Sequence, residues 1–244
     1  MRNRWHQLRG LVIAALVIVT WLGSLVGLLS LPLASLPVWL WPLGTLWMTF
    51  LYTGLFITAH DAIHGTLWRR HRRFNTWIGR IVMAVYALLP YDRLRDKHFQ
   101  HHKTPGRMQD PDYHGGGDSR FVPWYLHFMR NYVTVGQLVG MAAAFNGLLY
   151  WVRVPPANLV LFWAAPALLS TVQLFAFGTY LPHREPEGGY TNRHHACSND
   201  YPVWLSFLTC YHFGYHLEHH QYPNVPWWQL PRKRQQAQQE AASL

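Results

Sequence analysis

The 244-residue sequence predicts an all-α membrane protein with about four transmembrane helices in two hairpins and a cytoplasmic helical cap rich in histidine. Three observations support this fold class. Half of the residues are hydrophobic and only 13% are charged. The charged residues are gathered in two loops and the termini, which leaves long apolar stretches between them. The 13 Trp and 13 Tyr supply amphipathic rings that favour membrane interfaces.

Four stretches have the roughly 20 apolar residues that a helix needs to cross a bilayer. They cover residues about 11–31, 38–59, 132–152 and 157–181. Pro32 and Pro37 close the first pair into a hairpin, and Pro155 with Pro156 closes the second, because proline ends helices and favours turns. Both hairpins are therefore predicted to turn on the same side of the membrane.

Two shorter apolar runs, residues about 77–89 and 202–215, are predicted to be interfacial helices. The first carries Arg80, and each is too short to span the bilayer. The Gln-rich end, residues 235–244, is predicted to be a frayed tail. We expect residues 1–244 to form a single integral-membrane domain.

The basic residues predict the orientation, because Lys and Arg are retained in cytoplasmic loops. Of the 21 Lys and Arg residues, only Arg153 lies in a short outer loop. Both termini and the histidine-rich cap are therefore predicted to be cytoplasmic. The net charge of +10 is interpreted as a consequence of the orientation in the membrane and of contact with anionic lipids, and not as a sign of nucleic-acid binding.

Eight histidines fall into three clusters, each at the water-facing end of an apolar segment. Residues three or four apart share one face of a helix, so each cluster aims its imidazoles at a common point. Imidazole is the commonest metal ligand near neutral pH, and the pattern therefore predicts metal binding. The clusters are His60 and His64; His98, His101 and His102; and His216, His219 and His220.

The number of histidines favours a dinuclear site. A structural zinc ion is satisfied by four ligands, whereas the eight cluster histidines, with His183 as a ninth, can hold two metals with open positions. Imidazole accepts Zn, Cu, Fe or Ni, and we interpret the site as a di-iron centre. The alternative is a membrane metal carrier, but a carrier would place ionisable groups along a path through the bundle, and the predicted spans contain almost none.

Several further residues are predicted to support the ligands, because a ligating histidine usually donates its second ring N–H to a carboxylate or carbonyl group. Asp61 and Glu218 lie inside clusters, and Asp110 and Asp112 closely follow one. Asp200 is a weaker candidate that could instead cap the helix beginning near Pro202. His194 and His195 lie in a loop beside the third cluster and are predicted to ligate a metal, to support the ligands or to line the substrate entry.

Three segments resemble the histidine boxes of the membrane fatty-acid desaturase and hydroxylase superfamily: residues 60–65 (HDAIHG), 98–102 (HFQHH) and 215–223 (YHLEHHQYP). Residues 178–184 (GTYLPHR) and 194–198 (HHACS) further resemble the bacterial β-carotene ketolases, which oxidise carbon 4 of the β-ionone ring. Fatty-acid desaturases and carotenoid ring hydroxylases have the same boxes and remain alternatives.

The resemblance implies that the eight box histidines, with His183 as an extra ligand, bind two Fe²⁺ ions that use O₂ as co-substrate. It implies two successive hydroxylations at carbon 4 of β-carotene, followed by dehydration to the ketone of echinenone or canthaxanthin. It also implies a location in the bacterial inner membrane. The sequence contains no Gly-rich nucleotide motif and no haem-attachment motif, so an external electron donor such as a ferredoxin is expected to dock on the basic cytoplasmic face.

Overall fold

The computed structural model describes the backbone of residues 2–243 and the side chains of residues 8–243. The described chain consists of helices and loops without a strand, which confirms the all-α prediction. The helices are α1 (Arg2–Leu29), α2 (Leu40–His64), α3 (Arg72–Ala87), α4 (Tyr91–Lys103), α5 (Phe121–Tyr132), α6 (Val135–Tyr150), α7 (Pro156–Leu159), α8 (Ala165–Phe175), α9 (Leu181–His183), α10 (Val203–Cys210), α11 (His216–Gln221) and α12 (Leu230–Ala242). Four short helical turns join them: the 3₁₀ turns η1 (Leu33–Ser35) and η4 (Trp227–Gln229) and the π turns η2 (Val160–Ala164) and η3 (Ala176–Tyr180).

Three helical stretches are long and apolar enough to cross a membrane: Leu8–Leu29, Leu40–His64 and the continuous run Pro156–His183. The predicted span at 132–152 differs, because α6 has only 16 residues and reaches spanning length only together with α5, from which it is bent by 88°. The bend follows from extended backbone at Val133 and Thr134, where the Thr134 hydroxyl accepts the Gln137 N–H and starts a new helix. The described chain thus has three candidate spans, or four if the bent pair is one span.

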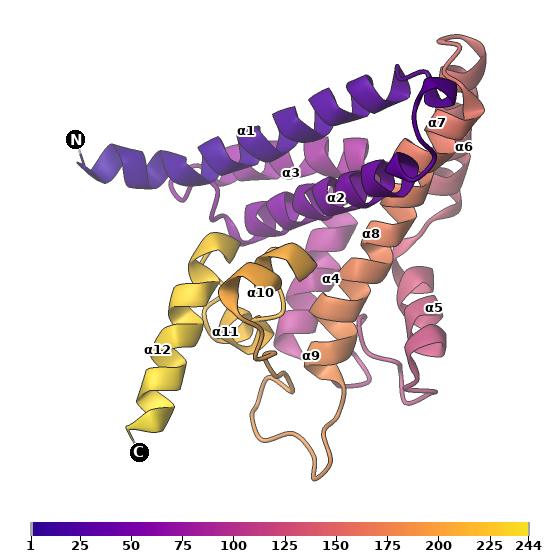
Figure 1. Cartoon of the computed structure of the whole chain (residues 1–244). Helices are drawn as coiled ribbons and strands as arrows, with labels where there is room; N and C mark the ends of the chain where they lie inside the picture. The colour runs from indigo at the N-terminus through magenta and orange to yellow at the C-terminus, as the bar shows by residue number, and fades with distance from the viewer. Residues whose placement is uncertain (1, 244) are drawn as a thin grey trace.

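The two hairpin turns lie together at one end of the bundle, at the upper right of Figure 1. The Asn158 side chain at the start of the last span joins them, since its amide donates to the carbonyl oxygens of Leu28 and Leu31 at 2.8 and 2.9 Å. Helices α4, α11 and α12 lie toward the other end of the bundle (Figure 1). This arrangement agrees with the prediction that both hairpins turn on the same side.

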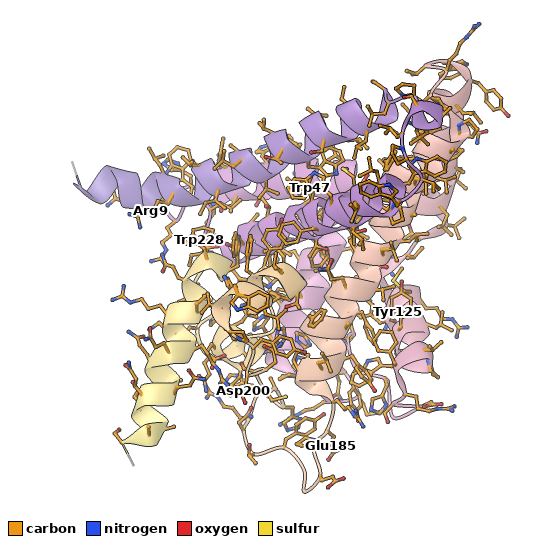
Figure 2. The ribbon with its side chains drawn as sticks, viewed as in Figure 1. Arg9, Trp47, Tyr125, Glu185, Asp200 and Trp228 are labelled. Carbon is orange, nitrogen blue, oxygen red and sulfur yellow. The ribbon has the colours of Figure 1, made fainter. Side chains whose placement is uncertain are left out.

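Helix α2 forms the centre of the bundle and contacts α1, α3 and α8. Trp47 of α2, labelled in Figure 2, donates its indole N–H to the Ser24 hydroxyl of α1 at 3.0 Å. On another side, Tyr86 of α3 shares a 2.6 Å hydrogen bond with Ser170 of α8. This packing fixes the C-terminal end of α2, which carries the first histidine cluster.

The cap differs from the sequence prediction at its borders. Helix α3 begins at Arg72 rather than near residue 77, and α10 ends at Cys210 because Tyr211 adopts a left-handed conformation with φ 49°. The end of the chain is helical through Ala242 instead of frayed, since Leu230 is buried and Arg234 is held by ion pairs.

Candidate metal centre

Four elements bring the nine predicted histidines together. Helix α2 supplies two of them from its last turn, α4 three, α11 three, and the end of α9 supplies His183. The π turn η3 directly precedes α9, and such wide turns often occur at functional sites. The ring nitrogens form two separate groups rather than one.

The first group combines imidazoles from three helices, with all of their ligand nitrogens within 4.8 Å of one another. His219 Nε2 lies 3.2 Å from His60 Nε2 and 2.9 Å from His102 Nε2. His64 Nε2 lies 2.7 Å from His98 Nε2. The members of this group are His60, His64, His98, His102 and His219.

The second group consists of His101, His183, His216 and His220, whose ligand nitrogens also lie within 4.8 Å of one another. His220 Nε2 lies 3.1 Å from both His101 Nε2 and His216 Nε2. All four side chains are buried. His101 and His102 are neighbours in the sequence but belong to different groups, because consecutive helical residues point about 100° apart.

The donor geometry fits a metal ion in each group. Imidazole nitrogens bind divalent metals at about 2.1 Å, which places adjacent donors about 3 Å apart in octahedral coordination. The Nε2–Nε2 distances of 2.7–3.2 Å match this edge. His183 adds a separate indication. Its Nδ1–H donates to the His195 carbonyl at 2.8 Å, so the lone pair lies on Nε2, which is buried and has no hydrogen-bond partner among the described residues.

At four of the predicted ligands the pKa values favour the neutral form that metals bind. Burial, followed by the neighbouring imidazoles, lowers the pKa of His98, His216, His219 and His220 well below the usual value. These rings are therefore neutral at pH 7 and present a free lone pair. Burial lowers the pKa of His101, but the neighbouring carboxylates of Asp112 and Asp110 raise it by more, so the net pKa of His101 is above its usual value.

The acidic loop after α4 holds His101 in place. Both carboxylate oxygens of Asp110 accept from His101 Nδ1, at 2.9 and 3.0 Å, which leaves His101 Nε2 as the ligand atom. Asp110 also accepts the backbone N–H groups of Gly106 and Asp112 at 2.8 and 2.9 Å. Asp112 lies 3.7 Å from His101 Nδ1 and accepts the Tyr132 hydroxyl, which ties the loop to α5.

Four other residues were predicted to support the ligands, and each takes a different position around the centre. The Asp61 carboxylate is 3.8 Å from His60 Nδ1, which is longer than a hydrogen bond. Glu218 contacts Ser198 and Arg234, and within the described residues its carboxylate makes no hydrogen bond to an imidazole. His194 lies beside the centre, with its ring centroid 5.8 Å from that of His220. His195 contributes its backbone carbonyl to His183, while its ring stacks on Tyr190.

Asp200 pairs with Arg234 rather than capping α10, whose N-cap residue Pro202 has no capping side-chain hydrogen bond. Sequence reasoning used Ser198 only as part of the 194–198 motif and assigned no supporting role to Gly106, Tyr132 or Arg234. Nothing in the local sequence patterns of these last three residues distinguishes them from ordinary loop and surface residues.

A cavity of about 510 Å³ adjoins both groups of histidines. Its lining includes His60 and His98 of the first group and His101 and His216 of the second. Most of the remaining lining is apolar and comes from α3, α5, α6, η2 and α8, including Tyr86, Phe128, Met141, Phe145, Trp163 and Leu174. The cavity therefore joins the metal centre to the membrane-facing helices.

Comparison with known proteins identifies the family. The sequence model of the fatty acid desaturase family matches residues 36–139 and 131–243. The chain belongs to the fatty acid desaturase family. Membership explains the three histidine boxes, and the more specific resemblance to β-carotene ketolases is confirmed by individual relatives.

Three members of this family illustrate the similarity. The chain is 43% identical over 199 residues to the β-carotene ketolase of Haematococcus lacustris, covering 77% of this chain and 60% of that protein. It is 40% identical to the zeaxanthin 4-ketolase of Chlamydomonas reinhardtii, covering 96% and 57% of the two chains. It is 38% identical to the β-carotene ketolase of Paracoccus sp. (strain N81106 / MBIC 01143), covering 92% and 91%. The chain thus spans less than two thirds of the two algal proteins and most of the bacterial one.

Proposed function

We propose that this chain is a di-iron, O₂-dependent ketolase that converts the carbon-4 methylene of β-ionone rings in β-carotene to a ketone. The observation that carries this proposal is the pair of imidazole groups, five rings and four rings, at the end of an apolar cavity. The relatives named β-carotene ketolase support the choice of substrate.

His60, His64, His98, His102 and His219 would hold one iron, and His101, His183, His216 and His220 the other. The iron pair, when bound, would activate O₂ to break a C–H bond, with electrons delivered by an external carrier. His101 and His183 are fixed as Nε2 ligands by the Asp110 carboxylate and the His195 carbonyl. The apolar lining holds the hydrocarbon ring and excludes water from the reacting carbon.

The overall reaction is balanced by two turnovers at the same carbon. In each turnover, one C–H bond becomes C–OH, one O₂ is consumed, and two electrons and two protons complete the formation of one water. The second turnover gives a geminal diol, which loses water to leave the ketone. Carbon 4 suits this chemistry because it is allylic, and a carotenoid dissolved in the bilayer can reach the cavity through the membrane-facing helices.

The electrons come from an external carrier, for which an acidic ferredoxin docking at the cytoplasmic surface is our proposal. Exposed Arg193 donates to His194 Nε2 at 3.3 Å, and His194 lies next to His220. Lys103 and Arg107, which follow the second histidine cluster, are also exposed, and in the described chain none of the three cations pairs with a carboxylate. The 103–107 and 193–195 segments meet at Gly106, which packs against His195.

We expect the double variant Arg107→Glu/Arg193→Glu to raise the KM for an acidic donor by about tenfold and to reduce its dependence on salt, because docking between complementary charges is electrostatic. Steady-state assays with purified donor at two ionic strengths measure both effects. Arg153→Glu, in the hairpin turn at the other end, is the matched control. Equal KM values for the two variants would exclude this surface.

The proposed function is tested by expressing the chain in a β-carotene-accumulating bacterium, beside His101→Ala, and analysing the pigments by chromatography and mass spectrometry. We expect a product that gains one oxygen and loses two hydrogens per modified ring, and none from the variant, because His101 is both a ligand and the partner of Asp110. Oxygen gain alone would indicate a ring hydroxylase. Unchanged β-carotene with iron-loaded protein present would exclude carotenoid oxidation and favour a fatty-acid desaturase, whereas metal uptake without any oxidised product would favour a carrier.

A further inference from the structure

Glu218 lies inside the third histidine box, yet its side chain faces away from the metal centre. Successive helical residues are about 100° apart, so the imidazoles of His216, His219 and His220 occupy about 100° of arc on α11. Glu218 falls about 150° from the middle of that arc, on the back of the helix. It is nevertheless buried, with only 2% of its side chain exposed. A carboxylate in such surroundings is costly unless it is paired.

Its partner comes from the C-terminal helix. Arg234 Nη1 of α12 donates to Glu218 Oε1 at 3.2 Å, and the Arg234 side chain is itself only 19% exposed. The guanidinium also pairs through Nη2 with Asp200, which is labelled beside α12 in Figure 2. Arg234 therefore connects α12, the loop before α10 and the back of α11.

The remaining contacts of Glu218 anchor the start of α11. Its Oε2 accepts the Ser198 hydroxyl, and Ser198 Oγ in turn accepts the Leu217 N–H at 3.1 Å. The neighbouring Asn199 N–H donates to the Gly214 carbonyl at 3.0 Å. Asn199 packs so closely on Gly214 that a Cβ there would lie 2.1 Å from its Nδ2 atom.

The orientation of α11 depends on these external contacts because the helix has only six residues. A helix this short gains little stability from its own hydrogen bonds. It nevertheless supplies ligands to both imidazole groups, His219 to the first, and His216 and His220 to the second. A rotation of α11 would therefore displace donors at both metals together.

We propose that Arg234 is a positioning residue for the metal centre, because it neutralises the buried Glu218 carboxylate and so keeps α11, with its three imidazole ligands, in the observed orientation. The inference rests on the proposed metal centre and extends it to the C-terminal helix. Loss of the guanidinium leaves the buried Glu218 carboxylate without a counter-charge. Rotation of α11 then exposes this carboxylate to water, and the same rotation moves the three imidazoles away from their positions in the metal centre.

The test compares Fe²⁺ affinities of the purified full-length chain, measured by competition with a chromophoric chelator. We expect Arg234→Met to weaken Fe²⁺ binding by about 10- to 100-fold, the usual cost of removing a residue that supports metal ligands. The double variant Glu218→Gln/Arg234→Met should recover to within about threefold of wild type, since the amide still accepts the Ser198 hydroxyl and no buried charge remains unpaired. Arg232→Met, on the same helix and exposed, is the matched control.

Mössbauer spectra of ⁵⁷Fe-loaded protein separate positioning from general stability, because they report ligand geometry in the molecules that retain iron. We expect an altered spectrum for Arg234→Met and the wild-type spectrum for the double variant.

The proposal would be overturned if Arg234→Met bound Fe²⁺ within threefold of Arg232→Met, or if the double variant bound Fe²⁺ no better than Arg234→Met. If Arg234→Met does not fold, the double variant decides: it must fold and bind Fe²⁺ like wild type. Ketone formation by the wild-type chain tests the proposed function separately and does not enter this comparison.

Discussion

The His219→Ala protein is expected to form no detectable ketone and to retain about half of the wild-type iron. His219 Nε2 lies within 3.2 Å of nitrogens from two other helices, His60 on α2 and His102 on α4. Its removal takes away the imidazole at which α2, α4 and α11 meet. The remaining rings of the first group lose a central donor, and we expect at least about a 100-fold loss of metal affinity there, at the upper end of what loss of a supporting residue costs.

Iron per chain, measured by elemental analysis of purified protein, and pigment analysis of the producing cells check this expectation. His127→Ala is the matched control, because His127 is exposed and belongs to neither imidazole group. The iron of the second group should survive, since His101, His183, His216 and His220 are unchanged. Ketone production equal to that of the control would show that the first group is not part of the active centre.

The candidate metal ligands could be identified from the sequence because the spacing of histidines along a helix is a local signal. Spacings of three and four place His60 with His64 and His98 with His101 or His102 on one helical face. Their division between two groups could not be predicted, since it depends on how α4 lies between the end of α2 and α11. Only the tertiary arrangement places His102 against His219 and His101 against His220.

The sequence predictions that were wrong also concern features that depend on tertiary contacts or on local backbone geometry. Residues 132–152 contain no charged residue, and hydropathy does not reveal that the chain turns by 88° at Val133 and Thr134, where neither proline nor glycine is present. The Gln-rich end was predicted to fray because its composition is polar, whereas the ion pairs of Arg234 join α12 to residues 16 and 34 positions away. Such contacts leave no periodic signal in the sequence.

The Asp110→Asn protein is expected to lose about 10- to 100-fold in Fe²⁺ affinity, although the substitution preserves size and shape. Each carboxylate oxygen of Asp110 accepts a backbone N–H as well as facing His101 Nδ1: Oδ2 accepts from Gly106 and Oδ1 from Asp112. An asparagine must place its NH₂ group at one of these two positions. In either orientation a donor then faces a donor in a buried site, which costs about 1–3 kcal/mol for each group left unsatisfied.

The loss should extend beyond stability to the metal centre, because the neutral amide no longer fixes the proton of His101 on Nδ1. Chelator competition measures the affinity, thermal unfolding without metal measures the fold, and pigment analysis measures the product. Asp118→Asn is the matched control, since Asp118 lies exposed in the same loop and, among the residues that the structure describes, pairs only with Arg120. If Asp110→Asn bound Fe²⁺ within twofold of the Asp118→Asn control, the hydrogen bond from His101 would be incidental, and the orientation of His101 would have to come from its packing against His183 and His220 instead.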